Sequence, residues 1–330
     1  MQQEQLLEKL EELFAIFSEY EKVTQTSFLN LVDLWVHSFQ VNGVADENSI
    51  SFYNAVDRFF SQNALSNEDK RRIWQYILLR VQEASGRDLE LTPDVICVFI
   101  AYLMKRFTGG KIVSIMDPAV GTANLLTAVL NELNESEYID IYGIDAQKSF
   151  LSYAAVNSEL QKRSIEFIFG DYLAIQLPVV HIMVCDLPVG YYPNKEISKA
   201  YQLNRTKTLA YSHELYLEKM LSHVQEGGYL FLLIPNHLFE RDKTKAVHQL
   251  ILSQAYIYGL LELPNELFQK TQERKSIFIL RKKGEGIYPV EQIMMVQIPS
   301  FQNEEGFQNI LIQMNQWFKE QLILNTDGGM

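Results

Sequence analysis

Residues 117–124 read Asp-Pro-Ala-Val-Gly-Thr-Ala-Asn, and this stretch decides the fold. It follows an apolar run at 112–116 and opens an apolar-periodic segment at 124–133. The pattern predicts a strand, a tight glycine turn and a helix. Because Gly121 has no Cβ, a ligand can approach its backbone closely, and the helix N-terminus offers unpaired N–H groups beside it. The stretch therefore predicts a ligand-binding loop.

A second predicted strand ends in Tyr-Gly-Ile-Asp at residues 142–145. It places the carboxylate of Asp145 at a strand end, where the two hydroxyls of an adenosine ribose can donate hydrogen bonds to it. Together with the glycine turn, this carboxylate predicts a site for a nucleoside cofactor.

Composition indicates a cytoplasmic globular protein with no membrane partner. The chain has 330 residues, of which 47% are hydrophobic and 12% aromatic, enough for a large core and more than one domain. No apolar run approaches the ~18 residues that span a bilayer, and the first residues are charged and helix-periodic. Cys97 and Cys185 lie in apolar runs without metal-binding spacing, so we expect reduced core cysteines.

Charge is unevenly distributed. The net charge of −12 argues against a strong general nucleic-acid binder, because neutralisation of phosphates drives such binding. Residues 195–283 nevertheless contain 14 Lys and Arg against 9 Asp and Glu. If DNA or RNA is a partner, we expect it to contact residues 188–283.

Residues 1–90 are expected to form a helical N-terminal domain. The apolar pattern of residues 6–84 is helical, and polar clusters at 42–49 and 61–69 divide it into roughly four helices. This region carries no catalytic motif, and we expect any protein partner to bind there. Next, Thr92 is predicted to cap a helix that has Pro93 at its first position.

The remaining chain, residues 91–330, alternates predicted strands and helices. We expect strands at 112–116, 139–144, 165–169, 179–185, 228–234, 256–262 and 275–282, and helices at 123–133, 147–160, 211–224 and 242–253. A further apolar run at 292–298 and a helix near 305–323 follow. Alternation is typical of an α/β fold, here Rossmann-like with a mostly parallel, seven-stranded sheet. The strand at 275–282 is predicted to be antiparallel, at one end of the sheet.

Five segments occur in an order that resembles a known family. They are LTPDVI (91–96), DPAVGTANLL (117–126), YGIDAQ (142–147), FGDYL (169–173) and DLPVGYYP (186–193). They resemble the motifs of adenine-specific DNA methyltransferases of class I, in which the first loop is usually DPACGTGNFL. The resemblance is closest to a bacterial group with a helical N-terminal domain. It implies S-adenosyl-L-methionine as the cofactor and DNA methylation as the activity.

The resemblance implies which residues receive the methionine part of the cofactor. Thr92 and Pro93 would form the near wall. Asp117, with the backbone around Ala119 and Gly121, would meet the charged amino-acid end and the positive sulfonium centre.

The same resemblance assigns the nucleoside part. Asp145 would accept the ribose hydroxyls. Asp171 would accept a hydrogen bond from the adenine amine, while Tyr172 or Ile144 packs on the ring.

The reactive motif is implied to be residues 186–189, Asp-Leu-Pro-Val, where the family has NPPY, NPPF or DPPY. Asp186 and the rigid Pro188 would be catalytic, because an acceptor that takes the amine hydrogens localises the nitrogen lone pair toward the methyl group. Leu187 replaces a proline and Val189 replaces an aromatic ring. A substitute ring is therefore needed to stack on a base.

The segment after this motif is rich in Tyr, Lys and Asn and predicts a substrate-binding loop. Tyrosines offer stacking faces and lysines offer phosphate contacts. The residues expected to contact substrate are Tyr191, Tyr192, Lys195 and Lys199, with Arg205 and Lys207 as further phosphate contacts.

The sequence thus predicts an amino-group methyltransferase of the adenine-specific DNA methylase type. The alternatives are a methyltransferase for a protein glutamine or an RNA base, and a non-catalytic S-adenosylmethionine-binding regulatory protein, which Leu187 and Val189 favour. After Lys283 only 47 residues remain, which we expect to be too few for a DNA target-recognition domain. The six histidines form no metal-binding pair, so no metal is expected.

Overall fold

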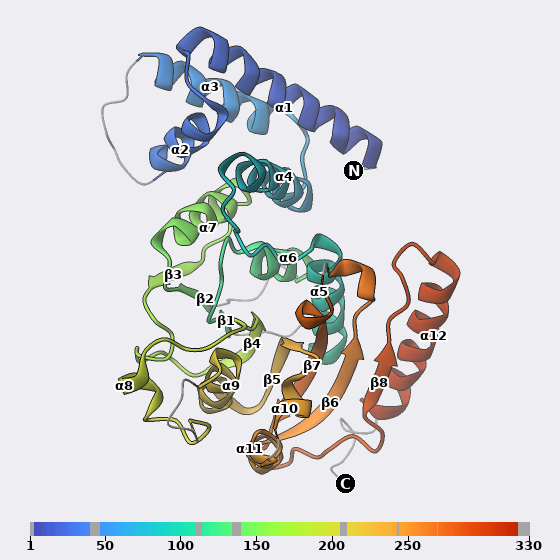
Figure 1. Ribbon diagram of the computed structural model, residues 1–330. Helices are drawn as coiled ribbons and strands as arrows, with labels where there is room; N and C mark the ends of the chain where they lie inside the picture. Colours follow the sequence, from blue (N-terminus) through green and yellow to red (C-terminus); the bar gives the residue numbers. More distant parts are fainter. Residues whose placement is uncertain are drawn as a thin grey trace.

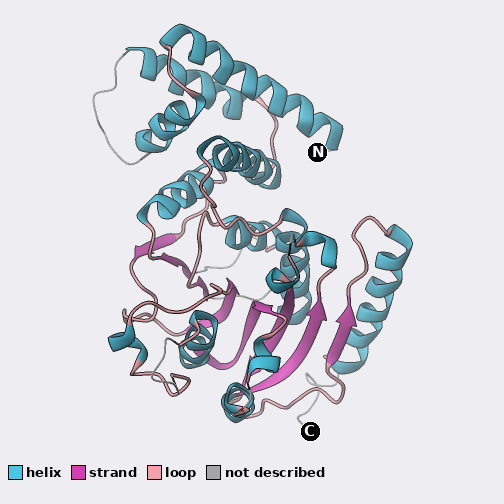
Figure 2. Cartoon of the chain, viewed as in Figure 1, coloured by secondary structure: helices cyan, strands magenta, loops and turns pink. Residues whose placement is uncertain are grey.

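The computed structural model describes residues 3–39, 47–109, 114–133, 140–204, 210–242, 244–268 and 270–322. The strands of these residues lie side by side in one sheet (Figures 1 and 2). They are β1 (Ser114–Asp117), β2 (Asp140–Asp145), β3 (Glu166–Phe169), β4 (Val180–Asp186), β5 (Val224–Pro235), β6 (Ala255–Glu262), β7 (Lys275–Lys282) and β8 (Met294–Gln297). Their order across the sheet is β3-β2-β1-β4-β5-β7-β6-β8.

Helices precede the sheet and cover it. The first four are α1 (Gln3–Thr24), α2 (Phe28–Ser38), α3 (Glu47–Gln62) and α4 (Asn67–Ser85). The longer helices that follow are α5 (Asp94–Thr108), α6 (Asn124–Glu132), α7 (Lys148–Leu160), α9 (Ser212–His223), α11 (Ala246–Gln254) and α12 (Glu304–Gln321). The short ones are α8 (Lys195–Ser198), α10 (Leu238–Arg241), η1 (Asn265–Leu267) and η2 (Thr271–Glu273).

The predicted α/β fold is confirmed, with two corrections to the sheet. It has eight strands among the described residues rather than seven, because the apolar run at 292–298 forms β8, which pairs parallel with β6. Strand β7 is antiparallel as predicted but does not lie at an end of the sheet: it pairs with both β5 and β6. Five consecutive residues of β7 are buried, and a strand that is apolar on both faces gains most from an interior position.

The two faces of the sheet carry different helices. Alternate residues of β5 point to opposite sides, as strand geometry requires. Leu230 and Leu232 pack with residues of α9 and α11, whereas Phe231 and Leu233 pack with residues of α5, α6 and α12. Cys97 and Cys185 are unpaired and fully buried, one in each of these two cores.

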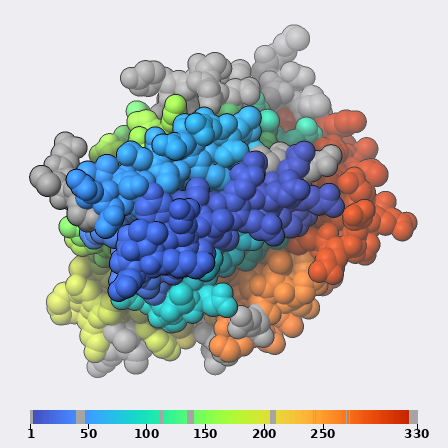
Figure 3. Space-filling view, turned by 90° about the horizontal axis from the view of Figure 1, so that it is seen from above, coloured from blue at the N-terminus to red at the C-terminus, as the bar shows by residue number. Residues whose placement is uncertain are grey.

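Helices α1 to α4 build a third apolar core. It includes the buried Trp35 and Trp74, and it takes in Phe150, Tyr153 and Val156 from α7. The indole Nε1 of Trp74 also donates to the backbone oxygen of Tyr153 at 3.2 Å. Helix α4 therefore lies between α1–α3 and the sheet helices (Figure 1), and the view from above shows α1 and α3 over the α/β part (Figure 3).

The start of α5 differs from the prediction by one residue. Pro93, not Thr92, occupies the cap position, and no side chain caps this helix. The Thr92 hydroxyl instead donates to Asp186 Oδ2 at 3.1 Å. Because a buried hydroxyl needs one partner, a tertiary acceptor here replaces the local cap.

Candidate functional site

Three aspartates end three neighbouring strands at the same edge of the sheet. Asp117, Asp145 and Asp186 are the last residues of β1, β2 and β4, which pair in parallel. All three line a cavity of about 820 Å³. The carboxyl edge of a parallel sheet is where ligands bind in α/β folds, so this cavity is the candidate site.

The glycine turn is held against β2. Gly121 has a positive φ of 53°, and no atom lies within 4 Å of the place where a Cβ would stand. Its N–H donates to Asp145 Oδ2 at 3.0 Å, and the Val120 N–H donates to the Ile144 oxygen at 2.8 Å. The turn therefore presents open backbone to the cavity, as the sequence predicts.

Asp117 is almost completely buried, with 2% of its surface exposed. Its Oδ1 accepts from the Ala119 N–H at 3.1 Å. Burial, with Asp145 and Asp186 nearby, raises the pKa of its carboxyl to about 8. A positive ligand group placed beside this carboxyl would favour its charged form.

Asp145 is oriented by two backbone donors. Its Oδ1 accepts from the Gln147 N–H at 2.7 Å, and its Oδ2 accepts from the Gly121 N–H. Burial raises its pKa. Each carboxylate oxygen can accept a second hydrogen bond, so the predicted ribose contacts remain available.

Asp186 has a partner that the sequence analysis missed. Lys275, the first residue of β7, forms a short ion pair with Asp186 Oδ1, while Thr92 occupies Oδ2. The side chains of Asp186 and Lys275 are each 21% exposed and both line the cavity. The antiparallel prediction for residues 275–282 was a usable signal, because an antiparallel strand begins at the edge where its parallel neighbours end.

Two predicted cofactor residues lie outside the cavity lining. Asp171 accepts from the Leu173 N–H at 3.0 Å and from the hydroxyl of Tyr192. Tyr172 is fully buried. Its ring packs at 5.2 Å on Tyr216 of α9, and Tyr216 does line the cavity. The roles of Asp171 and Tyr172 stay predictions, and Tyr216 is a wall residue that the motif comparison missed.

The two predicted stacking tyrosines have different environments. Tyr192 is 5% exposed and donates to Asp171, so its faces are covered. Tyr191 is 57% exposed and stacks on Tyr211 with ring centroids 4.6 Å apart. Leu187 is buried, whereas Val189 is half exposed and lines the cavity beside Pro188. Of the two tyrosines, only Tyr191 offers a ring surface.

The two described lysines among the predicted phosphate contacts lie outside the cavity lining. Lys195 is the first residue of α8 and Lys199 follows its last residue, and neither is among the lining residues. Lys199 forms an exposed ion pair with Glu196 at 2.6 Å. Arg205 and Lys207 lie outside the described residues. The structure therefore does not bring Lys195 and Lys199 to the three aspartates.

Acidic side chains dominate the cavity. The described residues that line it include six acids and two lysines: Asp88, Glu90, Asp117, Asp145, Asp186, Glu273, Lys270 and Lys275. Partial burial and the neighbouring carboxylates raise the pKa of Glu90. The field of such a lining attracts cations and opposes polyanions. Among the described residues, including those of the cavity, no group of three or more His, Cys, Asp and Glu could hold a metal ion. No helix among them is long and apolar enough to cross a membrane.

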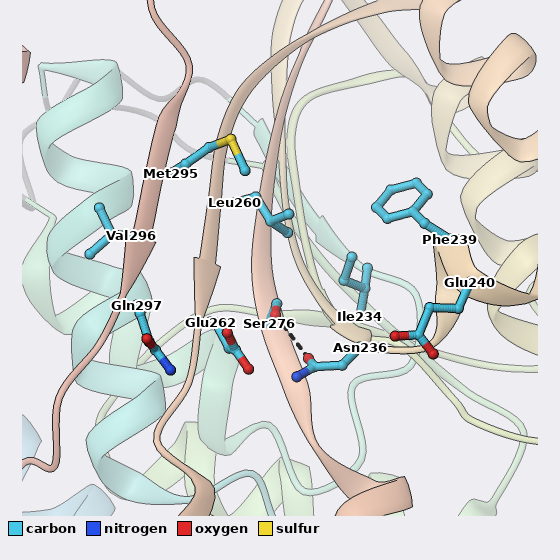
Figure 4. Close-up of a pocket in the computed structure, with 10 residues that line it drawn as sticks. All are labelled: Ile234, Asn236, Phe239, Glu240, Leu260, Glu262, Ser276, Met295, Val296 and Gln297. Carbon is cyan, nitrogen blue, oxygen red and sulfur yellow. Dashed lines mark hydrogen bonds between the residues drawn. The ribbon is translucent and has the colours of Figure 1, made fainter.

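A second cavity of about 460 Å³ lies between α10 and strands β5 to β8 (Figure 4). Two of its polar side chains satisfy each other, since the Ser276 hydroxyl donates to Asn236 Oδ1 at 2.8 Å. None of the residues predicted for the site lines it. The predicted site residues that line either of these two cavities therefore all line the larger one.

Comparison with known proteins shows the family of the chain. Residues 46–321 match the family model of the N-6 DNA methylases. The uncharacterized protein YtxK of Bacillus subtilis (strain 168) is 36% identical over 254 residues, which are 76% of this chain and 77% of that protein.

Two crystal structures share the fold. A Listeria monocytogenes protein assigned to the class I S-adenosylmethionine-dependent methyltransferases has a TM-score of 0.81 at 31% identity, covering 94% of this chain and 99% of that one. A modification subunit assigned to a type I restriction enzyme of Vibrio vulnificus YJ016 has a TM-score of 0.66 at 17% identity, covering 85% of this chain and 64% of that one. The family match spans most of the chain and the Listeria structure covers nearly all of it, so the chain belongs to the N-6 DNA methylase family of class I S-adenosylmethionine-dependent methyltransferases.

Proposed function

We propose that this protein binds S-adenosylmethionine in the larger cavity and methylates an amino nitrogen, in the manner of adenine-specific DNA methylases. The observation that carries the proposal is the meeting of Asp117, Asp145 and Asp186 around one cavity at the carboxyl edge of the sheet. The first two would hold the cofactor and the third would face the reacting amine.

The residues present fit the amino-acid end of this cofactor. Open backbone at Gly121 lets a ligand approach closely, and the buried Asp117 lies beside the Ala119 N–H. Thr92 and Pro93 also line the cavity. An ammonium or sulfonium charge would be stabilised by the Asp117 carboxylate, while backbone N–H groups would receive the cofactor carboxylate.

The nucleoside end would lie beside β2 and α9. Asp145 would accept the ribose hydroxyls on oxygens that two backbone N–H groups already orient. Tyr216 would supply an aromatic wall for the adenine ring. An aromatic pair contributes about 0.5–1.5 kcal/mol beyond its buried area.

The transfer chemistry depends on Asp186. When bound, the cofactor supplies an electrophilic methyl group on its sulfonium. Asp186 would accept a hydrogen bond from the amine, keep the nitrogen lone pair directed at the methyl carbon, and receive the proton that the nitrogen must lose. Lys275 and Thr92 hold the two carboxylate oxygens in place, which preorganises this acceptor.

Calorimetric titration tests the cofactor assignment. S-adenosylmethionine and its demethylated product should bind and NAD should not. A tritiated-methyl assay against DNA, RNA and lysate protein then tests transfer. Binding without transfer to any of these would move the assignment to a regulatory protein, and no binding of either methionine compound would refute the proposed function.

A protein amide is the second candidate acceptor. Its edge carries an N–H₂ group beside a carbonyl, and the site offers the matching pair: the acceptor Asp186 beside the donor Lys275. The acidic lining also suits a protein substrate better than a phosphate backbone. Tritium in lysate protein rather than in nucleic acid would select this candidate.

A further inference from the structure

We propose that helix α4 holds the methyl-transfer site in its working arrangement, with Arg71 and Gln75 as positioning residues. The inference rests on the proposed function for its catalytic consequence, but the physical linkage stands on the contacts alone. Arg71 and Gln75 are four positions apart, so they share one face of α4. Gln75 donates to Thr92 directly, whereas Arg71 donates to Asn124, which in turn donates to Thr92.

Arg71 is the anchor of this linkage. It is fully buried, and its guanidinium donates to Glu68 from Nε at 2.8 Å and from Nη2 at 2.5 Å. Nη2 also pairs with Asp94 at the start of α5. Nη1 donates to Asn124 Oδ1 at 2.5 Å. One buried side chain thus ties α4 to the first residues of α5 and α6.

Asn124 connects Arg71 to Thr92 through two hydrogen bonds. Asn124 is 5% exposed and is the first residue of α6, directly after the glycine turn. Because its amide oxygen accepts from Arg71, its Nδ2 must point the other way. Nδ2 donates to the Thr92 backbone oxygen at 3.0 Å.

Gln75 provides a second, direct arm. It is 8% exposed, and its Nε2 donates to the same Thr92 oxygen at 3.4 Å. The Thr92 carbonyl thus accepts from two side-chain amides and also from the Cys97 thiol at 3.6 Å, while the Thr92 hydroxyl donates to Asp186 Oδ2. Leu79 and Gln82, further along α4, line the cavity itself. Helix α4 is therefore a wall and a support of the site.

Substitutions separate this linkage from general stability. Arg71→Met removes the anchor, and Arg72→Gln is the matched control. Arg72 is a neighbour on α4 that pairs with Asp94 at 3.5 Å, but the hydrogen bond from α4 to Asn124 comes from Arg71. Hydrogen–deuterium exchange needs no ligand. We expect faster exchange of residues 91–97 and 119–127 in Arg71→Met and no change in Arg72→Gln. Equal exchange in the parent and Arg71→Met would overturn the inference.

Titration with the demethylated product provides the second measurement. We expect Arg71→Met to weaken binding by about tenfold or more, with Arg71→Lys partly restoring it. If Arg71 acts through Asn124, Arg71→Met adds little in an Asn124→Ala background, because a double-mutant cycle reports such coupling. Additive losses would overturn the inference. If the parent binds no methionine compound, the proposed function fails and the exchange result alone decides this linkage.

Gln75→Leu is the second variant, for the case in which Arg71→Met does not fold. If Arg71→Met gives no cooperative thermal transition, Gln75→Leu is used instead of Arg71→Met in both measurements. This variant removes only the hydrogen bond from the uncharged Gln75 amide to Thr92. Faster exchange at residues 91–97 would support the linkage. Unchanged exchange in a folded Gln75→Leu protein would contradict it.

Discussion

At the scale of single residues, Asp145 offers the sharpest test of the cofactor site. Its two oxygens accept from the Gly121 and Gln147 N–H groups, and the ribose hydroxyls would be additional donors. Asp145→Ala should therefore weaken cofactor binding by about 1.5–3 kcal/mol, the range for hydrogen bonds to a charged group. Calorimetry measures the loss, and Asp145→Asn, which keeps one oxygen acceptor, should lose less. Parent-like affinity in folded Asp145→Ala would refute the ribose assignment.

Asp117 should make cofactor affinity depend on pH. Its pKa is raised to about 8, so the free protein carries a neutral carboxyl at lower pH, whereas the positive cofactor prefers the carboxylate. Binding then releases a proton, and affinity should rise across about pH 6 to 9 and level off above the pKa. Asp117→Asn should bind more weakly at high pH and lose this slope. A flat profile in the parent protein would contradict the contact.

The same raised pKa has an opposite effect on the unliganded fold. The unfolded carboxyl ionises near its ordinary value of 3.8, while the folded one stays protonated to about 8. Its contribution to stability is therefore complete below the lower value and is lost as pH rises through the upper one. Chemical denaturation should show this decline between the two values, and it should be smaller in Asp117→Asn.

Tyr191 lies outside the cavity lining, but of the two predicted stacking tyrosines it is the one with an exposed ring, so we propose it as the substitute for the missing aromatic of the reactive motif. It is exposed and stacked on Tyr211, whereas Tyr192 is buried against Asp171. If a base is the substrate, Tyr191→Ala should lower kcat/KM by about tenfold, since base stacking contributes ~1–3 kcal/mol. Tyr191→Phe should stay near the parent value. A normal rate for Tyr191→Ala, with a gain from Val189→Tyr, would instead show that no ring fills this place.

At the scale of elements, the site depends on one contact between β4 and β7. Asp186 is the last residue of β4 and Lys275 is the first residue of β7. The two side chains form an ion pair although β5 lies between their strands in the sheet. Asp186→Ala should eliminate methyl transfer while cofactor affinity stays near the parent value. Lys275→Met should lower the transfer rate less, because Thr92 still orients the carboxylate. Undiminished transfer by Asp186→Ala would sink the catalytic assignment.

At the scale of the whole molecule, charge separates the candidate substrates. The cavity lining is acidic, and the described lysines Lys195 and Lys199, at the two ends of α8, lie outside it. If nucleic acid is the substrate, its phosphates must meet such distant cations, so binding should weaken steeply with salt and charge reversal at both lysines should reduce it strongly. Cofactor affinity should not change. Nucleic-acid binding that does not change with salt concentration would favour the protein amide as the methyl acceptor.

The linear chain was sufficient for the order of elements and for much of the cofactor loop. Strand and helix positions follow from apolar periods of two and 3.6 residues, which neighbours in sequence create. The glycine turn and the carboxylates that end β1, β2 and β4 are likewise local signals, because each aspartate closes its own apolar run. Residues 117–124 together with Asp145 therefore predicted a nucleoside site without any knowledge of long-range contacts.

Only the tertiary structure decided which side chains complete the site. Lys275 meets Asp186 across 89 residues, Thr92 meets it across 94, and Arg71 reaches Asn124 across 53. No local period encodes such pairs, because they depend on where β7 inserts in the sheet and on how α4 packs over α6. Burial removes these polar groups from water and obliges them to find protein partners. The partners they find are set by the packing of whole elements rather than by their neighbours in sequence.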